Sequence, residues 1–126
     1  MVSNICQRLI NKVWRSYADE LDIAPHAEGI YTIGFEYPDG EVDYIYVGHS
    51  NDIRRRLQEH KRQDLDIDEF VKYQFRGNGG QNLGIKWVEE KDSECVEGEY
   101  LDCMHKKLGY WPEYNKKKGN QCNQCN

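Results

Sequence analysis

Two tyrosines, an arginine and a histidine follow one another in an order that suits chemistry on a phosphate ester. The tyrosines belong to the triplets Gly29-Ile30-Tyr31 and Tyr46-Val47-Gly48, and Arg56 and His60 follow four residues apart. A phenolate can take a proton from water, a guanidinium binds phosphate oxygens, and an imidazole gains or loses a proton near neutral pH. Brought together, these groups could hydrolyse a phosphodiester.

Sequence patterns place the two tyrosines on paired strands. Residues 29–36 and 41–48 alternate between apolar and polar side chains, which is typical of half-buried strands. Pro38-Asp39-Gly40 between them has the composition of a turn. We therefore predict an antiparallel hairpin with Tyr31 and Tyr46 on neighbouring strands.

A change of period after Gly48 predicts a helix that carries the arginine and the histidine. Ile53 and Leu57 mark its apolar face, and Ser50 or Asn51 can cap its beginning. Residues four apart lie on the same face of a helix, so Arg56 and His60 border the apolar stripe together. The hairpin and the helix are expected to meet at one concave surface.

The two triplets, their spacing and the following helix resemble the GIY-YIG nuclease family. The resemblance covers residues 29–118 and implies an α+β domain, in which helices flank a small three-stranded antiparallel or mixed sheet. It also implies that Tyr31 activates water, that Tyr46 orients water or phosphate, that Arg56 holds the scissile phosphate and that His60 orients Tyr31 or relays its proton. Some members have a lysine where this chain has His49.

A later helix supplies the carboxylate that the family uses for its metal ion. The apolar positions between Ser93 and Leu108 recur at helical spacing, after Asp92 or Ser93 as the N-cap. The resemblance assigns the metal to a glutamate followed by bulky apolar residues at three and four positions, which favours Glu97 over Glu99. It implies one Mg²⁺ or Mn²⁺ per site, no small-molecule cofactor, and a supporting role for Asn115 in Pro112-Glu113-Tyr114-Asn115.

Charge along the chain predicts where DNA would bind. The net charge of −5 opposes general binding to phosphates, but residues 52–62 hold five Lys or Arg against two acids. Residues 89–102 hold seven acids against one lysine, and Lys116-Lys117-Lys118 forms a second basic run that can equally be a solvated surface. The substrate-binding candidates are cationic side chains around the predicted arginine helix: His49, Arg54, Arg55, Lys61 and Arg62.

Length and composition set the remaining expectations. A chain of 126 residues suits one domain that acts as a monomer or weak homodimer. No apolar run is long enough to span a membrane, and no signal-peptide pattern begins the chain, so we expect an intracellular protein that is not secreted. Five cysteines without a regular framework favour reduced thiols over a disulfide scaffold. Cys122-Asn123-Gln124-Cys125 could bind zinc, but a flexible tail over residues 119–126 is the preferred interpretation.

The rest of the chain is predicted to complete the fold. Apolar residues at helical spacing predict one amphipathic helix from Asn4 to Leu21, within an N-terminal extension over residues 1–28. Val71–Phe75 and Gly84–Glu89 have the composition of strands, with a short acidic helical turn before the first. A glycine-rich loop, 76–82, separates them and lacks the P-loop pattern.

Two other functions remain compatible with the sequence. The chain could be a GIY-YIG module that binds nucleic acid without cleaving it, or a protein-interaction domain that uses its acidic residues and its N-terminal helix. DNA affinity that depends on salt separates the interaction domain from the other two functions, and metal-dependent cleavage separates the nuclease from the silent module.

Overall fold

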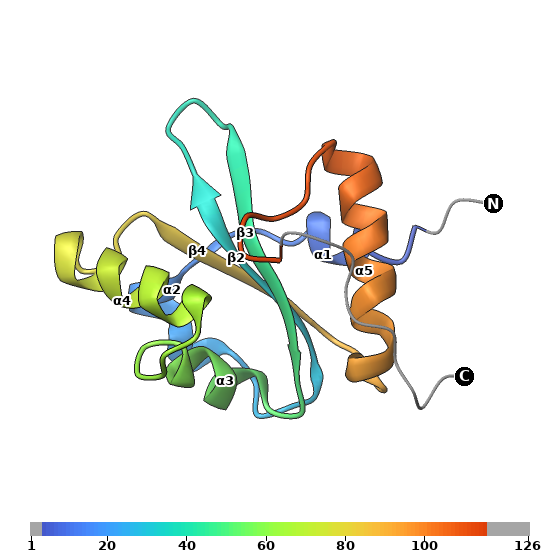
Figure 1. The fold of residues 1–126 in the computed structure, drawn as a ribbon, viewed down its shortest axis with the longest axis horizontal. Helices are drawn as coiled ribbons and strands as arrows, with labels where there is room; N and C mark the ends of the chain where they lie inside the picture. The colour runs from blue at the N-terminus through green and yellow to red at the C-terminus, as the bar shows by residue number, and fades with distance from the viewer. Residues whose placement is uncertain (1–3, 116–126) are drawn as a thin grey trace.

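The computed structural model describes residues 4–115, which form an α+β fold around a four-stranded antiparallel sheet (Figure 1). The elements are α1 (Gln7–Ile10), β1 (Arg15–Ser16), α2 (Tyr17–Glu20), the 3-10 helix η1 (Leu21–Ile23), β2 (Gly29–Glu36), β3 (Val42–Ser50), α3 (Ile53–Glu59), α4 (Asp66–Asn78), β4 (Leu83–Glu89) and α5 (Ser93–Leu108). The strand order is β1-β4-β2-β3. The predicted fold class is confirmed, although β1 adds a short fourth strand to the three expected.

Helices cover both faces of this sheet, so the protein has two apolar clusters. Period-two alternation in β2 sends Ile30 into the cluster under α1 and α5, and Tyr31 and Ile33 into the cluster under α2, α3 and α4. Because β2 is central and both its faces are covered, six consecutive residues from Gly29 are buried. Tyr31 therefore lies inside the protein rather than on its surface.

The hairpin was predicted correctly and sets the register of the two tyrosines. Tyr31 pairs with Gly48 across β2 and β3, and Ile33 pairs with Tyr46. Side chains of directly paired residues project from the same face of a sheet, so both phenols lie on the face that α3 covers. The cap of α3 differs from the prediction: Asp52, rather than Ser50 or Asn51, accepts the hydrogen bond from Arg55 N.

The segment 71–75 is a helix, and its prediction as a strand was wrong. Val71, Tyr73 and Phe75 alternate with polar residues, but Val71 is buried whereas Tyr73 is 66% exposed. Ile67 and Val71, four residues apart, instead form the buried stripe of α4. α4 also runs into the predicted glycine-rich loop and ends at Gly79, whose positive φ of 71° suits a residue without a side chain.

The prediction of a single N-terminal helix over residues 4–21 was also wrong, because the chain leaves the helical conformation after α1. Val13, which should belong to the apolar face of that helix, is 82% exposed. Instead, Arg15 and Ser16 pair with Ile85 and Gly84 of β4. The hydrogen bonds of this short ladder and the burial of Tyr17 replace the expected helical packing.

A disulfide joins the N-terminal segment to the last helix, an outcome that the sequence analysis did not expect. Cys6 precedes α1, and Cys103 lies on α5; both are buried, at 0% and 2% exposure. The expectation of reduced thiols is therefore wrong for this pair. Cys122, Cys125, the tail over residues 119–126 and the Lys116-Lys117-Lys118 run lie outside the described residues. None of the helices in residues 4–115 combines the length and apolar composition that a membrane crossing requires.

Removing this disulfide should destabilise the protein. A bond that closes such a long loop restricts the unfolded chain, so Cys6→Ala/Cys103→Ala should lower the free energy of unfolding by about 2–4 kcal/mol in urea denaturation. Peptide mapping of alkylated native protein gives the control, because it shows whether the two sulfurs are joined. An unchanged urea midpoint in the double variant would contradict the prediction.

Candidate active site

The predicted tyrosine and histidine meet inside the protein. Tyr31 of β2 and His60, the residue that ends α3, both have no exposed surface. The distance between Tyr31 Oη and His60 Nε2 is 2.6 Å, which is a short hydrogen bond. Burial raises the pKa of Tyr31 well above its ordinary value, because the phenolate would lose its hydration. An acceptor is therefore needed at this phenol if it is to lose its proton.

Asp68 continues this chain of contacts and was not among the predicted site residues. Its Oδ1 lies 2.5 Å from His60 Nδ1, and its Oδ2 accepts a hydrogen bond from Leu65 N at 2.9 Å. Asp68 lies in the first turn of α4 and has no exposed surface. In the sequence, only its place directly beside Ile67 in the acidic run could have indicated this role. That position faces the core once the segment is recognised as the helix α4.

Tyr46 is the partly exposed member of the tyrosine pair. Its ring centroid lies 6.2 Å from that of Tyr31 and 5.6 Å from that of His60. Burial and the negative charge of Glu97 raise the pKa of Tyr46, whereas Arg56 and a hydrogen bond with Tyr31 lower it. The structure therefore brings four predicted site residues close to the phenol of Tyr46: Tyr31, Arg56, His60 and Glu97. Tyr46, rather than the fully buried Tyr31, presents its surface to solvent.

Gly48 explains how the two phenols fit against β3. A methyl group at its Cα would lie 2.6 Å from Tyr31 Oη and 2.8 Å from a ring carbon of Tyr46. Both distances are shorter than any ordinary contact, so a larger residue would displace the phenols. The glycine of the second triplet thus makes room for the tyrosines of both triplets.

Arg56 lies beside the phenols with only 17% of its side chain exposed. Its Nη1 donates to Gln63 Oε1 at 3.1 Å and lies 3.4 Å from Glu59 Oε1. Its positive charge lowers the pKa of Tyr31 and of His60. Phosphate could replace these exchangeable side-chain acceptors, since a guanidinium binds its oxygens well.

Glu97 approaches the site from α5, on the opposite side of β3. Its Oε1 lies 3.2 Å from His49 Nδ1, and its side chain is 17% exposed. The hydrogen bond with Glu97 raises the pKa of His49. Glu99 is exposed on the same helix and does not share this contact. Glu97 therefore contacts His49 beside the site, whereas Glu99 is exposed, and the choice of Glu97 as the metal ligand stays a prediction.

Asn115 supports the site through the backbone of β3. Its side-chain oxygen accepts from Val47 N, and its side-chain amide donates to Val47 O, each at 2.9 Å. Tyr114 N donates to Ile45 O at 3.0 Å beside it. Asn115 thus holds the strand segment between Tyr46 and Gly48, without itself contacting the phenols.

The predicted substrate-binding cations divide into two groups. Arg54 is turned toward the body of the protein, where its Nε donates to Ala24 O at 2.6 Å, so the structure does not bring it to the site. His49 and Arg55 line a hollow of about 290 Å³ beside Glu97's helix. Lys61 lines another of about 320 Å³, over the ring of Phe75, and Arg62 is exposed. Arg55 also pairs with Glu59 at 3.6 Å, and Glu28 and Glu94 line the same hollow as His49, whereas Lys61 and Arg62 are exposed.

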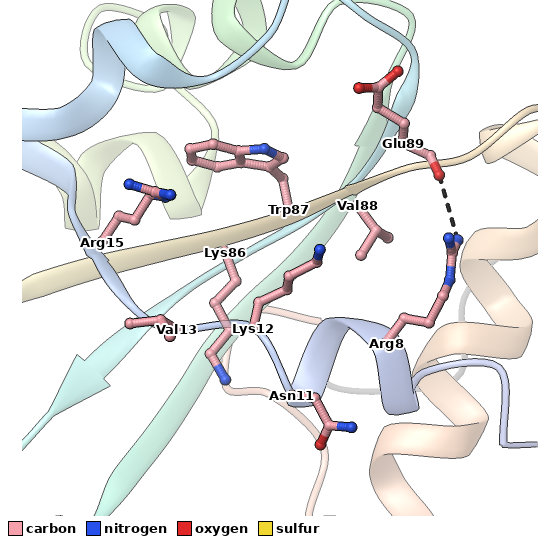
Figure 2. A pocket seen from close by; sticks show the side chains of 9 residues that line it. All are labelled: Arg8, Asn11, Lys12, Val13, Arg15, Lys86, Trp87, Val88 and Glu89. Atoms are coloured by element: carbon pink, nitrogen blue, oxygen red, sulfur yellow. Dashed lines mark hydrogen bonds between the residues drawn. The ribbon is translucent and has the colours of Figure 1, made fainter.

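A separate basic hollow of about 550 Å³ lies along the outer edge of β4 (Figure 2). Among the described residues, the short strand β1 is the one strand that pairs with this edge. Its cations are mostly engaged within the protein. Arg8 pairs with Glu90 at 3.2 Å, and Arg15 pairs with Glu20 at 3.1 Å. Lys86 is buried and turned away, donating to Ile10 O and Tyr44 Oη. The arginines of α3 are paired as well, Arg55 with Glu59 at 3.6 Å and Arg56 with Glu59 at 3.4 Å, so internal pairing does not distinguish the two surfaces.

The donor groups would suit a metal ion that takes most of its ligands from water and substrate. Among residues 4–115, no three His, Cys, Asp or Glu side chains cluster as a metal site. A magnesium ion nevertheless needs only one or two carboxylates when water and substrate phosphate supply its other ligands. Glu97, near the two phenols and partly open to solvent, fits that requirement.

Comparison of the chain with protein-family models, curated proteins and solved structures finds no match in any of the three. The functional assignment therefore depends on the residues and geometry of this chain alone.

Acid should destabilise the protein through His60. Burial, with Arg56 nearby, lowers the pKa of His60 to about 4 in the folded state, below the ordinary value of 6.5. The unfolded chain therefore binds this proton first, and the free energy of unfolding should fall by about 3 kcal/mol as pH drops from 6.5 to 4. Urea denaturation at several pH values measures this fall. His60→Gln should show a smaller fall, and equal falls in both proteins would contradict the assignment.

Proposed function

We propose that this protein is a metal-dependent endonuclease of the GIY-YIG kind, which hydrolyses DNA phosphodiester bonds and leaves 5′-phosphate ends. The observation that carries the proposal is the 2.6 Å hydrogen bond between Tyr31 and His60, surrounded by Tyr46, Arg56 and Glu97. Each group has a use in phosphodiester hydrolysis. Their arrangement around one buried hydrogen bond is more specific than a basic surface alone.

The phenols remove a proton from the attacking water. Tyr46 is the phenol open to solvent, so water is expected to meet Tyr46 first, whereas the sequence resemblance assigned that contact to Tyr31. As the water gives a proton to Tyr46, Tyr46 gives its own to Tyr31 and Tyr31 gives its own to His60 Nε2. The hydroxide oxygen bonds to phosphorus, the bond to the 3′ oxygen breaks, and solvent protonates the leaving 3′ oxygen.

Arg56 binds the scissile phosphate in this proposal. Negative charge develops on the non-bridging oxygens during attack. A fixed guanidinium therefore stabilises the transition state more than it stabilises the ground state. Because the side chain is mostly buried, it retains less water that the phosphate must displace. Burial raises the pKa of both phenols, and the positive charge of Arg56 offsets part of that rise.

Glu97 would hold the single Mg²⁺ or Mn²⁺ ion. Such an ion supplies Lewis acidity toward the phosphate oxygens and the leaving group. His49 Nδ1 lies 3.2 Å from Glu97 Oε1, so His49 would compete with a metal ion for this carboxylate. Metal affinity is therefore expected to be low without DNA.

DNA is the proposed partner, bound along α3 by His49, Arg55, Lys61 and Arg62. We propose a monomer or weak homodimer with an intracellular location, where DNA is found. The Cys6–Cys103 disulfide is compatible with reducing surroundings only while soluble thiols cannot reach it, and both cysteines are buried.

A catalytically silent nucleic-acid-binding module is the second candidate. The observation in its favour is the complete burial of Tyr31, which keeps this phenol from direct contact with water. Binding of plasmid without any nicking in Mg²⁺ or Mn²⁺ would support the silent module over the nuclease.

Glu97 should be essential for cleavage, and Glu99 should not. Glu97→Gln removes the charge that would hold the metal, so metal-dependent nicking of supercoiled plasmid should fall at least ~100-fold. Glu99→Gln, with the same charge change on an exposed part of the same helix, is the matched control. EDTA should stop cleavage by the native protein. Comparable activity in both variants would remove Glu97 from the site.

Arg56 should act on catalysis, whereas Arg62 should act only on binding. Arg56→Ala should lower kcat for plasmid nicking by roughly 100-fold, because transition-state charge loses its guanidinium. Arg62→Ala removes an exposed cation from the same region; it should weaken DNA binding and reduce the salt dependence by about one counterion. Single-turnover rates with saturating protein separate the two effects. Equal rates for both variants would contradict the assigned role of Arg56.

A further inference from the structure

In the buried chain Tyr31–His60–Asp68, the contacts determine which atom donates and which atom accepts each hydrogen bond. Asp68 Oδ2 is already occupied by the N–H of Leu65, and Oδ1 faces His60 Nδ1 at 2.5 Å. The carboxylate also lies in the first turn of α4. An ionised carboxylate only accepts hydrogen bonds, so the proton between Asp68 and His60 belongs to Nδ1.

This constraint fixes the other ring nitrogen as well. A neutral imidazole carries one proton, so Nδ1–H leaves Nε2 with a free lone pair. Nε2 is the atom that lies 2.6 Å from Tyr31 Oη, and it must therefore accept the phenolic proton. With the opposite tautomer, Nε2–H would donate to Tyr31 and could not remove its proton.

We propose that Asp68 is the positioning residue of the catalytic base, holding His60 as the Nδ1–H tautomer so that Nε2 takes the proton of Tyr31. The proposal rests on the nuclease function proposed above. In this step the Tyr31 O–H bond breaks and an Nε2–H bond forms. Tyr31 receives the proton of Tyr46, and His60 becomes an imidazolium whose charge faces the Asp68 carboxylate. After cleavage the proton returns to solvent through Tyr31 and Tyr46, because His60 itself has no exposed surface.

The groups around His60 suit this task. Tyr31 and Tyr46 face it from the sheet, Arg56 and Glu59 act on it from α3, and Asp68 faces it from α4. Burial and Arg56 keep the ring neutral at pH 7, so that it is free to accept, while Asp68 and Glu59 favour the charged form that follows. Without Asp68, His60 would still be neutral at pH 7 and free to accept a proton. Once protonated, however, it would lose the carboxylate that stabilises its positive charge most.

The tautomer can be measured without any enzymatic activity. Nitrogen NMR of ¹⁵N-histidine-labelled native protein at pH 7 should show His60 with a protonated Nδ1 and an unprotonated Nε2. His60→Gln identifies the resonances. A protonated Nε2 in the native protein would overturn the proposal directly, even if no Asp68 variant could be purified.

Asp68→Asn and Asp66→Asn form a matched pair for kinetics. Both remove one negative charge from the first turn of α4, but Asp66 is exposed and makes no contact with His60. Asp68→Asn should lower kcat for plasmid nicking by about 10²–10⁴-fold with little change in KM, since only proton transfer is impaired. Its pH–rate profile should also change: without the carboxylate, the pKa of His60 falls further and the acidic limb moves to lower pH. Asp66→Asn should behave as native.

The outcomes separate the two proposals. Loss of kcat with a shifted acidic limb supports the role of Asp68, whereas activity equal to that of Asp66→Asn overturns it. A loss of activity with an unshifted limb and an unchanged His60 tautomer also overturns it, because that result indicates a structural defect. If the native protein cleaves no plasmid, the nuclease function and the catalytic role of Asp68 both fail, and the NMR measurement then reports only on the hydrogen bond.

Discussion

The hydrogen bond between Tyr31 and His60 is the interaction on which the rest of the site depends. It can form only because a central strand and the end of α3 are packed so closely that both side chains lose all contact with solvent. A buried phenol and a buried imidazole each require a partner, and each supplies the other. Their second partners, Tyr46 and Asp68, follow from the same requirement, which extends the polar chain from the surface to the interior.

This burial also defines the electrostatic design of the protein. A chain with a net charge of −5 cannot attract DNA through its overall charge. It instead gathers cations along α3 and leaves acids in residues 89–102 and the first turn of α4. Arg56, largely desolvated beside the phenols, acts on their protonation more strongly than an exposed arginine would. Local placement thus outweighs net charge.

The sequence predicted those parts of the fold where a local pattern and the tertiary structure agree. The hairpin, β4 and α5 have clear periods and terminal signals, and the structure contains all of them. Val71–Phe75 misled because alternating apolar residues also occur on a helix with an exposed tyrosine. The N-terminal segment misled because its pairing with β4, distant in sequence, overrides its helical spacing. Asp68 was missed for a related reason: its burial depends on α4 packing into the same apolar cluster as α3.

Asn115 has a further consequence that follows from the strand order. β3 is an edge strand, and an edge strand offers free backbone groups with which another chain can pair. The amide of Asn115 occupies both backbone groups of Val47, and Tyr114 occupies the carbonyl of Ile45 next to it. The residue that holds β3 beside the candidate site therefore also blocks the extension of the sheet into a second molecule at Val47, so that protection from aggregation and support of the site reside in the same side chain.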